Sequence, residues 1–88
     1  MKIKSGFMLK EIAGSFVVVP VGQDLVDFSS MVTINETGAF LWKILENGST
    51  PEEMCTKLLA EYEGIQRKEA LADIDEFVNA LKKNNILE

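Results

Sequence analysis

The hydrophobic pattern changes its period between Ile34 and Glu36, and no other feature constrains the fold as much. Residues 31–34 (MVTI) alternate as in a β-strand, which places Val32 and Ile34 on the same side of the strand. From Glu36 to Leu45 the apolar residues recur instead with the period of an α-helix. A strand therefore passes directly into a helix, and any fold proposed for the chain must contain this unit.

Polar residues mark the starts of the helices. Asn35 is a favoured N-cap for the first helix, because its side-chain oxygen can accept from the free amides of the first turn. The second helix has Thr50 as cap, Pro51 at the first helical position and Glu53 three residues after the cap, the arrangement of a capping box. A third helix is predicted from residue 66 or 67 to about residue 84, without a strong cap.

The predicted helices end at residues that tolerate a left-handed backbone. Asn47–Gly48 ends the first helix, Gly64 ends the second, and Asn84–Asn85 takes the place of glycine after the third. Beyond that last stop, Ile86 and Leu87 are expected to fold back onto the core.

Two further strands precede the strand-helix unit. Residues 7–12 and 16–21 have strand patterns and are joined by a turn at Ala13–Ser15, so a hairpin is expected. Pro20 cannot donate a ladder hydrogen bond and belongs near the end of its strand. The element order predicts an α+β, winged-helix-like single domain over residues 1–88, with an N-terminal three-stranded antiparallel β-sheet followed by a three-helix bundle.

Composition limits the class of protein. With 88 residues, of which 47% are apolar and 26% charged, the chain supports one globular domain. Its longest uninterrupted apolar run, residues 16–21, is far shorter than the roughly 20 residues of a membrane helix, and the N-terminus lacks the pattern of a signal peptide. The lone Cys55 cannot form an internal disulfide, which fits a reducing compartment. A cytoplasmic location without membrane contact is therefore expected.

The excess negative charge lies in the helical half. Residues 1–35 hold three basic and three acidic residues, whereas residues 36–88 hold six basic and eleven acidic residues, which gives the net charge of −5. A hairpin followed by helices invites a DNA-binding interpretation, but the would-be recognition helix carries Glu69, Asp73 and Asp75 in its first half. Because nucleic-acid binders neutralise phosphates with basic side chains, nucleic acid is not an expected partner.

The residues needed for catalysis are missing or scattered. The chain has no histidine and a single cysteine, so neither a Ser-His-Asp set nor a zinc site of the usual kind can be assembled. The pairs Glu52–Glu53 and Asp75–Glu76 could be acid and base, but the first pair is explained by its place in a helical first turn. Cys55 lacks a histidine to activate it and is interpreted as a structural thiol. We expect no enzyme activity, no cofactor and no metal site.

The predicted third helix has a broad apolar face. The residues that suffice to meet the core are Leu71, Ile74, Val78 and Leu81. The residues along a second edge are Ala70, Asp73, Phe77 and Ala80. The helix is either buried on two sides or forms one wall of a shallow apolar groove with an acidic lip. The strand at residues 31–34 would be the other wall, because an edge strand can pair with an added peptide.

Several segments follow one another in a recognisable order: a strand ending in IN, then ETGAFLWKIL, then GST before the second helix, and IDEFVNAL in the third. Together they resemble the PqqD family, small proteins whose fold is the RiPP recognition element, over nearly the whole chain. The resemblance implies a non-catalytic peptide-binding adaptor or chaperone. Such a protein binds the leader of a ribosomally made precursor peptide and presents it to a modifying enzyme, commonly a radical SAM maturase, in biosynthesis of the coenzyme PQQ kind. The terminal NNILE departs from the glycine that ends this helix in many relatives.

The resemblance also implies which residues bind the peptide. In the family the leader adds as a strand beside the third strand and lies against the third helix. The matching strand residues here are Met31, Val32, Thr33 and Ile34, and the matching helix residues are Ala70, Asp73, Phe77 and Ala80. Three further matching residues, interpreted as cap, close packing and core, are Asn35, Gly38 and Trp42. Replacing Phe77 by alanine is expected to weaken leader binding and leave the fold largely intact. The same is expected of Thr33→Pro, provided that the N–H of Thr33 faces the free edge of the strand.

Another class of function would use the same surface. A protein–protein interaction or regulatory module of winged-helix type would pair with another protein, or with itself, through the strand edge and the helix face. Such a module would form a stable dimer with the groove covered. The leader-binding interpretation expects a monomer or weak dimer, so gel filtration at several protein concentrations separates the two.

Overall fold

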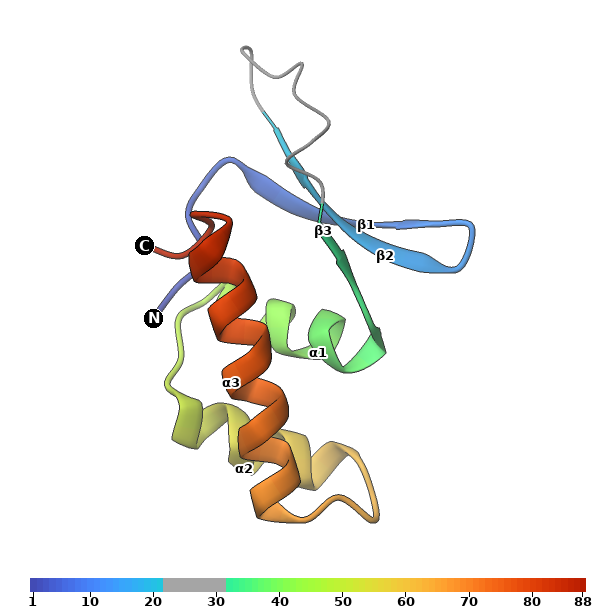
Figure 1. Cartoon of the computed structure of the whole chain (residues 1–88), viewed down its shortest axis with the longest axis vertical. Helices are drawn as coiled ribbons and strands as arrows, with labels where there is room; N and C mark the ends of the chain where they lie inside the picture. The colour runs from blue at the N-terminus through green and yellow to red at the C-terminus, as the bar shows by residue number, and fades with distance from the viewer. Residues whose placement is uncertain (22–31) are drawn as a thin grey trace.

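The computed structural model describes residues 1–21 and 32–88 and shows three strands followed by three helices. The strands are β1 (Phe7–Ile12), β2 (Ser15–Pro20) and β3 (Val32–Ile34), and the helices are α1 (Glu36–Leu45), α2 (Pro51–Glu61) and α3 (Arg67–Lys83). The helices gather below one end of the sheet, and β3 runs from the sheet straight into α1 (Figure 1). The predicted α+β class and element order are confirmed. Within the described residues, no helix is long and apolar enough to cross a membrane.

The predicted hairpin is confirmed. β1 and β2 pair antiparallel, and the pair Ile12↔Ser15 closes a two-residue turn. Both turn residues have positive φ, 52° at Ala13 and 83° at Gly14, which matches the twist of the flanking strands. Pro20 is the last residue of β2, where its missing N–H group costs the ladder little.

β3 lies at an edge of the sheet. The strand order is β1-β2-β3, and β3 pairs with β2 through Phe16↔Ile34, Val17↔Thr33 and Val18↔Val32. Val32 and Ile34 are half-buried against the core, whereas Thr33 is exposed, so the predicted alternation is confirmed for these three residues. No described strand pairs with the other edge of β3.

The joint between β3 and α1 is closed by the predicted cap. The side-chain oxygen of Asn35 accepts a hydrogen bond of 2.7 Å from the backbone N–H of Gly38, and the Asn35 carbonyl accepts from the N–H of Ala39 at 2.9 Å. Asn35 itself is extended, so the chain turns from strand to helix at this one residue. At the other end of α1, Gly48 has a φ of +86° and provides the left-handed stop.

The capping box predicted for α2 is only half present. The Thr50 hydroxyl accepts from the N–H of Glu53 at 3.2 Å, as predicted. The carboxylate of Glu53 does not return to the N–H of Thr50; its nearest recorded donor is the hydroxyl of Ser49, at 3.4 Å. Ser49 is buried, and its N–H donates to the carbonyl of Met1. The N-terminal segment therefore helps to hold Ser49 beside Glu53.

α3 ends in a Schellman motif centred on Asn85. The N–H of Ile86 donates to the Leu81 carbonyl at 2.9 Å, and the N–H of Asn85 donates to the Lys82 carbonyl at 3.1 Å. Asn85 has a φ of 60°, and Ile86 is completely buried, which confirms both the stop and the return to the core. The next residue, Leu87, pairs with Ile3, so the two chain ends lie side by side (Figure 1).

The left-handed backbone of Asn85 gives a direct test of this helix end. We expect Asn85→Ala to be less stable than Asn85→Gly by about 1 kcal/mol, because the left-handed backbone conformation is unfavourable for alanine and not for glycine. Both variants lose the exposed 2.7 Å bond from Lys4 Nζ to the Asn85 side chain, so their comparison isolates the backbone term. Urea denaturation measures the difference, and equal stabilities would contradict the left-handed assignment.

The core joins the helices to the inner face of the sheet. Its completely buried members include Val18 of β2, Leu45 of α1 and Leu58 of α2. Trp42 is 1% exposed, which confirms it as a core residue. In α2 Met54 and Leu58 are completely buried, whereas Tyr62, at the end of the helix, is half-buried and meets Phe40 edge to face at 5.7 Å between ring centroids.

Candidate functional site

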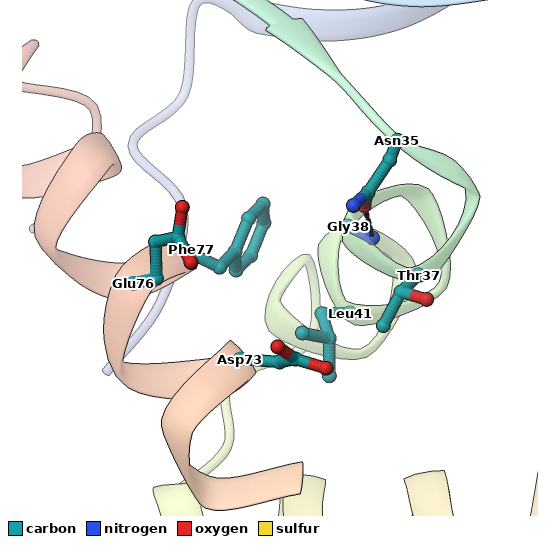
Figure 2. Close-up of a pocket in the computed structure, with 7 residues that line it drawn as sticks. All are labelled: Asn35, Thr37, Gly38, Leu41, Asp73, Glu76 and Phe77. Carbon is teal, nitrogen blue, oxygen red and sulfur yellow. Dashed lines mark hydrogen bonds between the residues drawn. The ribbon is translucent and has the colours of Figure 1, made fainter. Parts of the chain in front are cut away.

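A small pocket opens where three elements meet: the end of β3, the first turns of α1 and the middle of α3. Its volume is about 100 Å³. The residues that line it are Asn35, Thr37, Gly38, Leu41, Asp73, Glu76 and Phe77 (Figure 2). Two of these, Asp73 and Phe77, belong to the site predicted from the sequence. The pocket therefore borders the helical wall of the predicted groove, and the strand wall meets it only through Asn35, the residue that follows β3.

Gly38 allows the three elements to approach one another. A Cβ atom at Gly38 would lie 3.1 Å from the Cβ of Ile34 and 3.4 Å from Cδ1 of Phe77. It would also lie 3.2 Å from Oδ1 of Asn35, the atom that caps the helix. These distances are tight for carbon, so a side chain here would push against β3, the cap and α3 together. The close-packing interpretation of Gly38 is confirmed.

The predicted strand residues that the structure describes lie on the edge strand β3, and none of them lines this pocket. Thr33 is exposed, and Val32 and Ile34 are half-buried with their side chains toward the core. Met31 lies outside the described residues. β3 can therefore offer a peptide its unpaired backbone edge, while its apolar side chains stay with the core.

The predicted helix residues differ in how much surface they expose. Asp73 is exposed and Ala80 is half-buried, so both are within reach of a ligand. Ala70 is completely buried and offers no surface to a peptide in this structure. Ala70 does lie on the second edge of α3, but neighbouring elements cover the N-terminal part of that edge.

Phe77 is more deeply placed than the sequence suggested. Its side chain is only 8% exposed and belongs to the hydrophobic core, although its ring lines the pocket. Figure 2 shows the ring reaching from α3 toward Gly38. The expectation that Phe77→Ala leaves the fold largely intact is therefore wrong, because the change would empty a core position as well as the pocket.

Five lining residues were not predicted as part of the site: Asn35, Thr37, Gly38, Leu41 and Glu76. Asn35 was predicted only as the cap of the helix. Gly38 carried a usable signal, because glycine inside a helix is costly and indicates a close approach. Glu76 is three residues after Asp73, so a helical wheel already places the two carboxylates on neighbouring positions. Thr37 and Leu41 gave no such signal, since their relation to α3 depends on the tertiary packing.

The pocket is acidic. Asp73 and Glu76 are both exposed, and no lysine or arginine is among the lining residues. Within residues 1–21 and 32–88 the single salt bridge joins Arg67 to Glu52 at 2.7 Å, away from this pocket. The two carboxylates therefore have no recorded cationic partner in the described part of the chain.

The polar groups of the site are few. Its polar atoms are an amide engaged in a helix cap, a threonine hydroxyl and two carboxylates. Cys55 is completely buried elsewhere, with Nη1 of Arg67 at 3.8 Å from its sulfur, which confirms it as a buried thiol. Among the described residues, no three histidine, cysteine or acidic side chains are grouped as metal ligands would be.

Comparison with known proteins supports a specific relationship. A solved structure of TbiB1 in complex with the TbiA(beta) leader peptide is similar over 100% of this chain and 95% of that one, with a TM-score of 0.75 and 26% identity. A lasso peptide synthetase B1 complexed with the leader peptide covers 97% of this chain and 93% of its own, with a TM-score of 0.71 and 22% identity. At that lower identity the second likeness shows the fold alone. No curated protein matches the sequence.

The sequence model of the family described as coenzyme PQQ synthesis protein D matches residues 15–87. This range holds β2, β3, all three helices and every lining residue of the pocket. The chain belongs to the PqqD family.

Proposed function

We propose that this protein is a leader-peptide-binding adaptor in the biosynthesis of a ribosomally made, enzymatically modified peptide. The observation that carries the proposal is the edge of β3 that no strand in residues 1–21 or 32–88 covers, near a partly apolar pocket on α1 and α3. An added strand takes affinity from backbone hydrogen bonds and specificity from pockets for its alternate side chains. Asn35 connects the two features, because it follows β3 directly and lines the pocket.

The fold relatives support the same assignment. One is a complex of TbiB1 with a leader peptide, and it matches this chain over its full length. Membership of the PqqD family agrees with a role in peptide modification. In the proposed complex the leader backbone pairs with Val32, Thr33 and Ile34 and its side chains lie against Asp73, Phe77 and Ala80.

The adaptor raises the effective concentration of the precursor peptide at the modifying enzyme. It holds the leader while the adjoining part of the precursor reaches a modifying enzyme, which makes the modification step effectively intramolecular. We propose a radical SAM maturase as that enzyme, and a monomeric single domain over residues 1–88 as the working form. No group of the adaptor takes part in the chemistry.

Reconstitution with candidate precursor peptides and radical SAM enzymes, chosen from the genes that neighbour the one for this protein, tests the proposal. We expect the adaptor to accelerate modification of the precursor, and the isolated leader segment, added in excess, to abolish the acceleration. Modification at the same rate with and without the adaptor would contradict the proposed role. A stable dimer in gel filtration with the groove covered would instead favour the protein–protein interaction module.

A further inference from the structure

We propose that the pocket beside Phe77 receives a lysine or arginine side chain of the leader, so that the protein selects leaders with a basic residue at one fixed position. This inference rests on the proposed function and names the chemistry of its ligand. It starts from the composition of the pocket: two carboxylates, an aromatic ring and a leucine around a cavity of about 100 Å³.

The pocket combines an apolar wall with an acidic rim. Phe77 is 8% exposed and presents a small part of its ring to the cavity, whereas Leu41 is 1% exposed and lies beneath it. Asp73 and Glu76 stand at the surface of α3, and Figure 2 shows Asp73 directed toward Leu41. A lysine or arginine has matching parts, since its methylene stem packs along apolar surface while its charged head stays near water and carboxylates.

Other leader side chains fit this pocket less well. An apolar side chain would remove water from the two carboxylates and give them no partner in exchange. An acidic side chain could be attracted to the N-terminus of α1. However, Asn35 already accepts from the Gly38 N–H there, and Glu36 already places a negative charge in the first turn. A basic side chain is the one class that satisfies both carboxylates.

The charge of the whole protein acts in the same direction. The net charge is −5, and residues 36–88 hold eleven acidic against six basic residues. Such a field attracts a basic peptide to the helical half before any contact forms. The local pair Asp73 and Glu76 then decides where along the leader the basic residue must stand.

Selection from a library of random peptides tests the inference independently of the precursor's own sequence. The full chain is immobilised, bound peptides are sequenced, and the strongest binder is synthesised with its basic residue intact or replaced by norleucine. We expect the binders to share lysine or arginine at one position, and the norleucine peptide to bind about fivefold more weakly.

Variants of α3 show whether the two carboxylates are responsible. In the double variant Asp73→Asn/Glu76→Gln, we expect the same loss of about fivefold for the basic peptide and no further loss for the norleucine peptide. The matched control is Glu69→Gln/Asp75→Asn, which removes two charges from the same helix at exposed residues outside the pocket lining. We expect the control to change affinity far less.

The outcomes separate the inference from the proposed function. Peptides that bind the β3 edge without a basic preference, and that are indifferent to Asp73→Asn/Glu76→Gln, would overturn the inference and leave the proposed function standing. A loss equal in the test and control variants would also overturn it, because only overall charge would then matter. Recovery of no peptide that binds this groove would overturn both.

Discussion

Replacing Phe77 by alanine is expected to lower the free energy of unfolding by about 3 kcal/mol or more. The ring is 8% exposed and belongs to the core, and it fills the space left by the absent side chain of Gly38. Since domains of this size are stable by only about 5 to 15 kcal/mol, the variant would lose a large part of its stability. Urea denaturation followed by the helical circular dichroism signal measures the change.

A conservative variant separates the core role of Phe77 from its role in the pocket. Phe77→Leu keeps an apolar side chain at the site, and we expect it to cost about 1 to 2 kcal/mol while the protein stays folded. Binding measured on this variant then reports the pocket. A cost below about 1 kcal/mol for Phe77→Ala would contradict the core position of the ring.

Proline substitutions along β3 are expected to divide into two kinds. Successive residues of an antiparallel strand direct their N–H groups to opposite edges, so Thr33 faces one edge while Val32 and Ile34 face the other. Where the N–H points to β2, proline breaks the ladder and destabilises the fold. Where it points to the free edge, we expect the fold to survive and the affinity for a selected peptide to fall about tenfold.

The pair of readouts makes this scan decisive. Each variant, Val32→Pro, Thr33→Pro and Ile34→Pro, is measured for stability in urea and for peptide affinity. We expect the variants that stay folded to be those that bind poorly. A folded variant that binds as tightly as the parent would show that the leader does not pair with the edge of β3. Pro20, already at the end of β2, shows that this sheet accepts proline where no ladder bond is lost.

Local sequence signals were sufficient for most of the fold. The strand-helix joint was predictable because Asn35 has both the side chain for a cap and the position where the hydrophobic period changes. The stop at Asn85 was predictable from a residue type that tolerates positive φ. Only half of the predicted capping box forms, because the Glu53 carboxylate accepts from the Ser49 hydroxyl and not from the Thr50 N–H. That contact depends on the packing around Ser49 and not on the Thr50–Glu53 spacing.

The site was less predictable because burial depends on neighbours from other elements. A helical wheel places Ala70 and Phe77 on one edge of α3 but cannot show that both are covered, one completely and the other nearly so. Glu76 lines the same pocket, but the apolar periodicity that defines the second edge of the helix gives no weight to a carboxylate. Met31 lies outside the described residues and stays a prediction.

The most direct test of leader recognition is an NMR titration of the isotope-labelled protein with the leader segment of a precursor peptide that the reconstitution identifies. We expect the amide shifts to concentrate at residues 32–34, at Gly38 and along residues 73–80, with little change in α2. If the titration is repeated with the maturase present and the shifts still fall on the β1–β2 hairpin or on α2 alone, the groove between β3 and α3 is not the leader site.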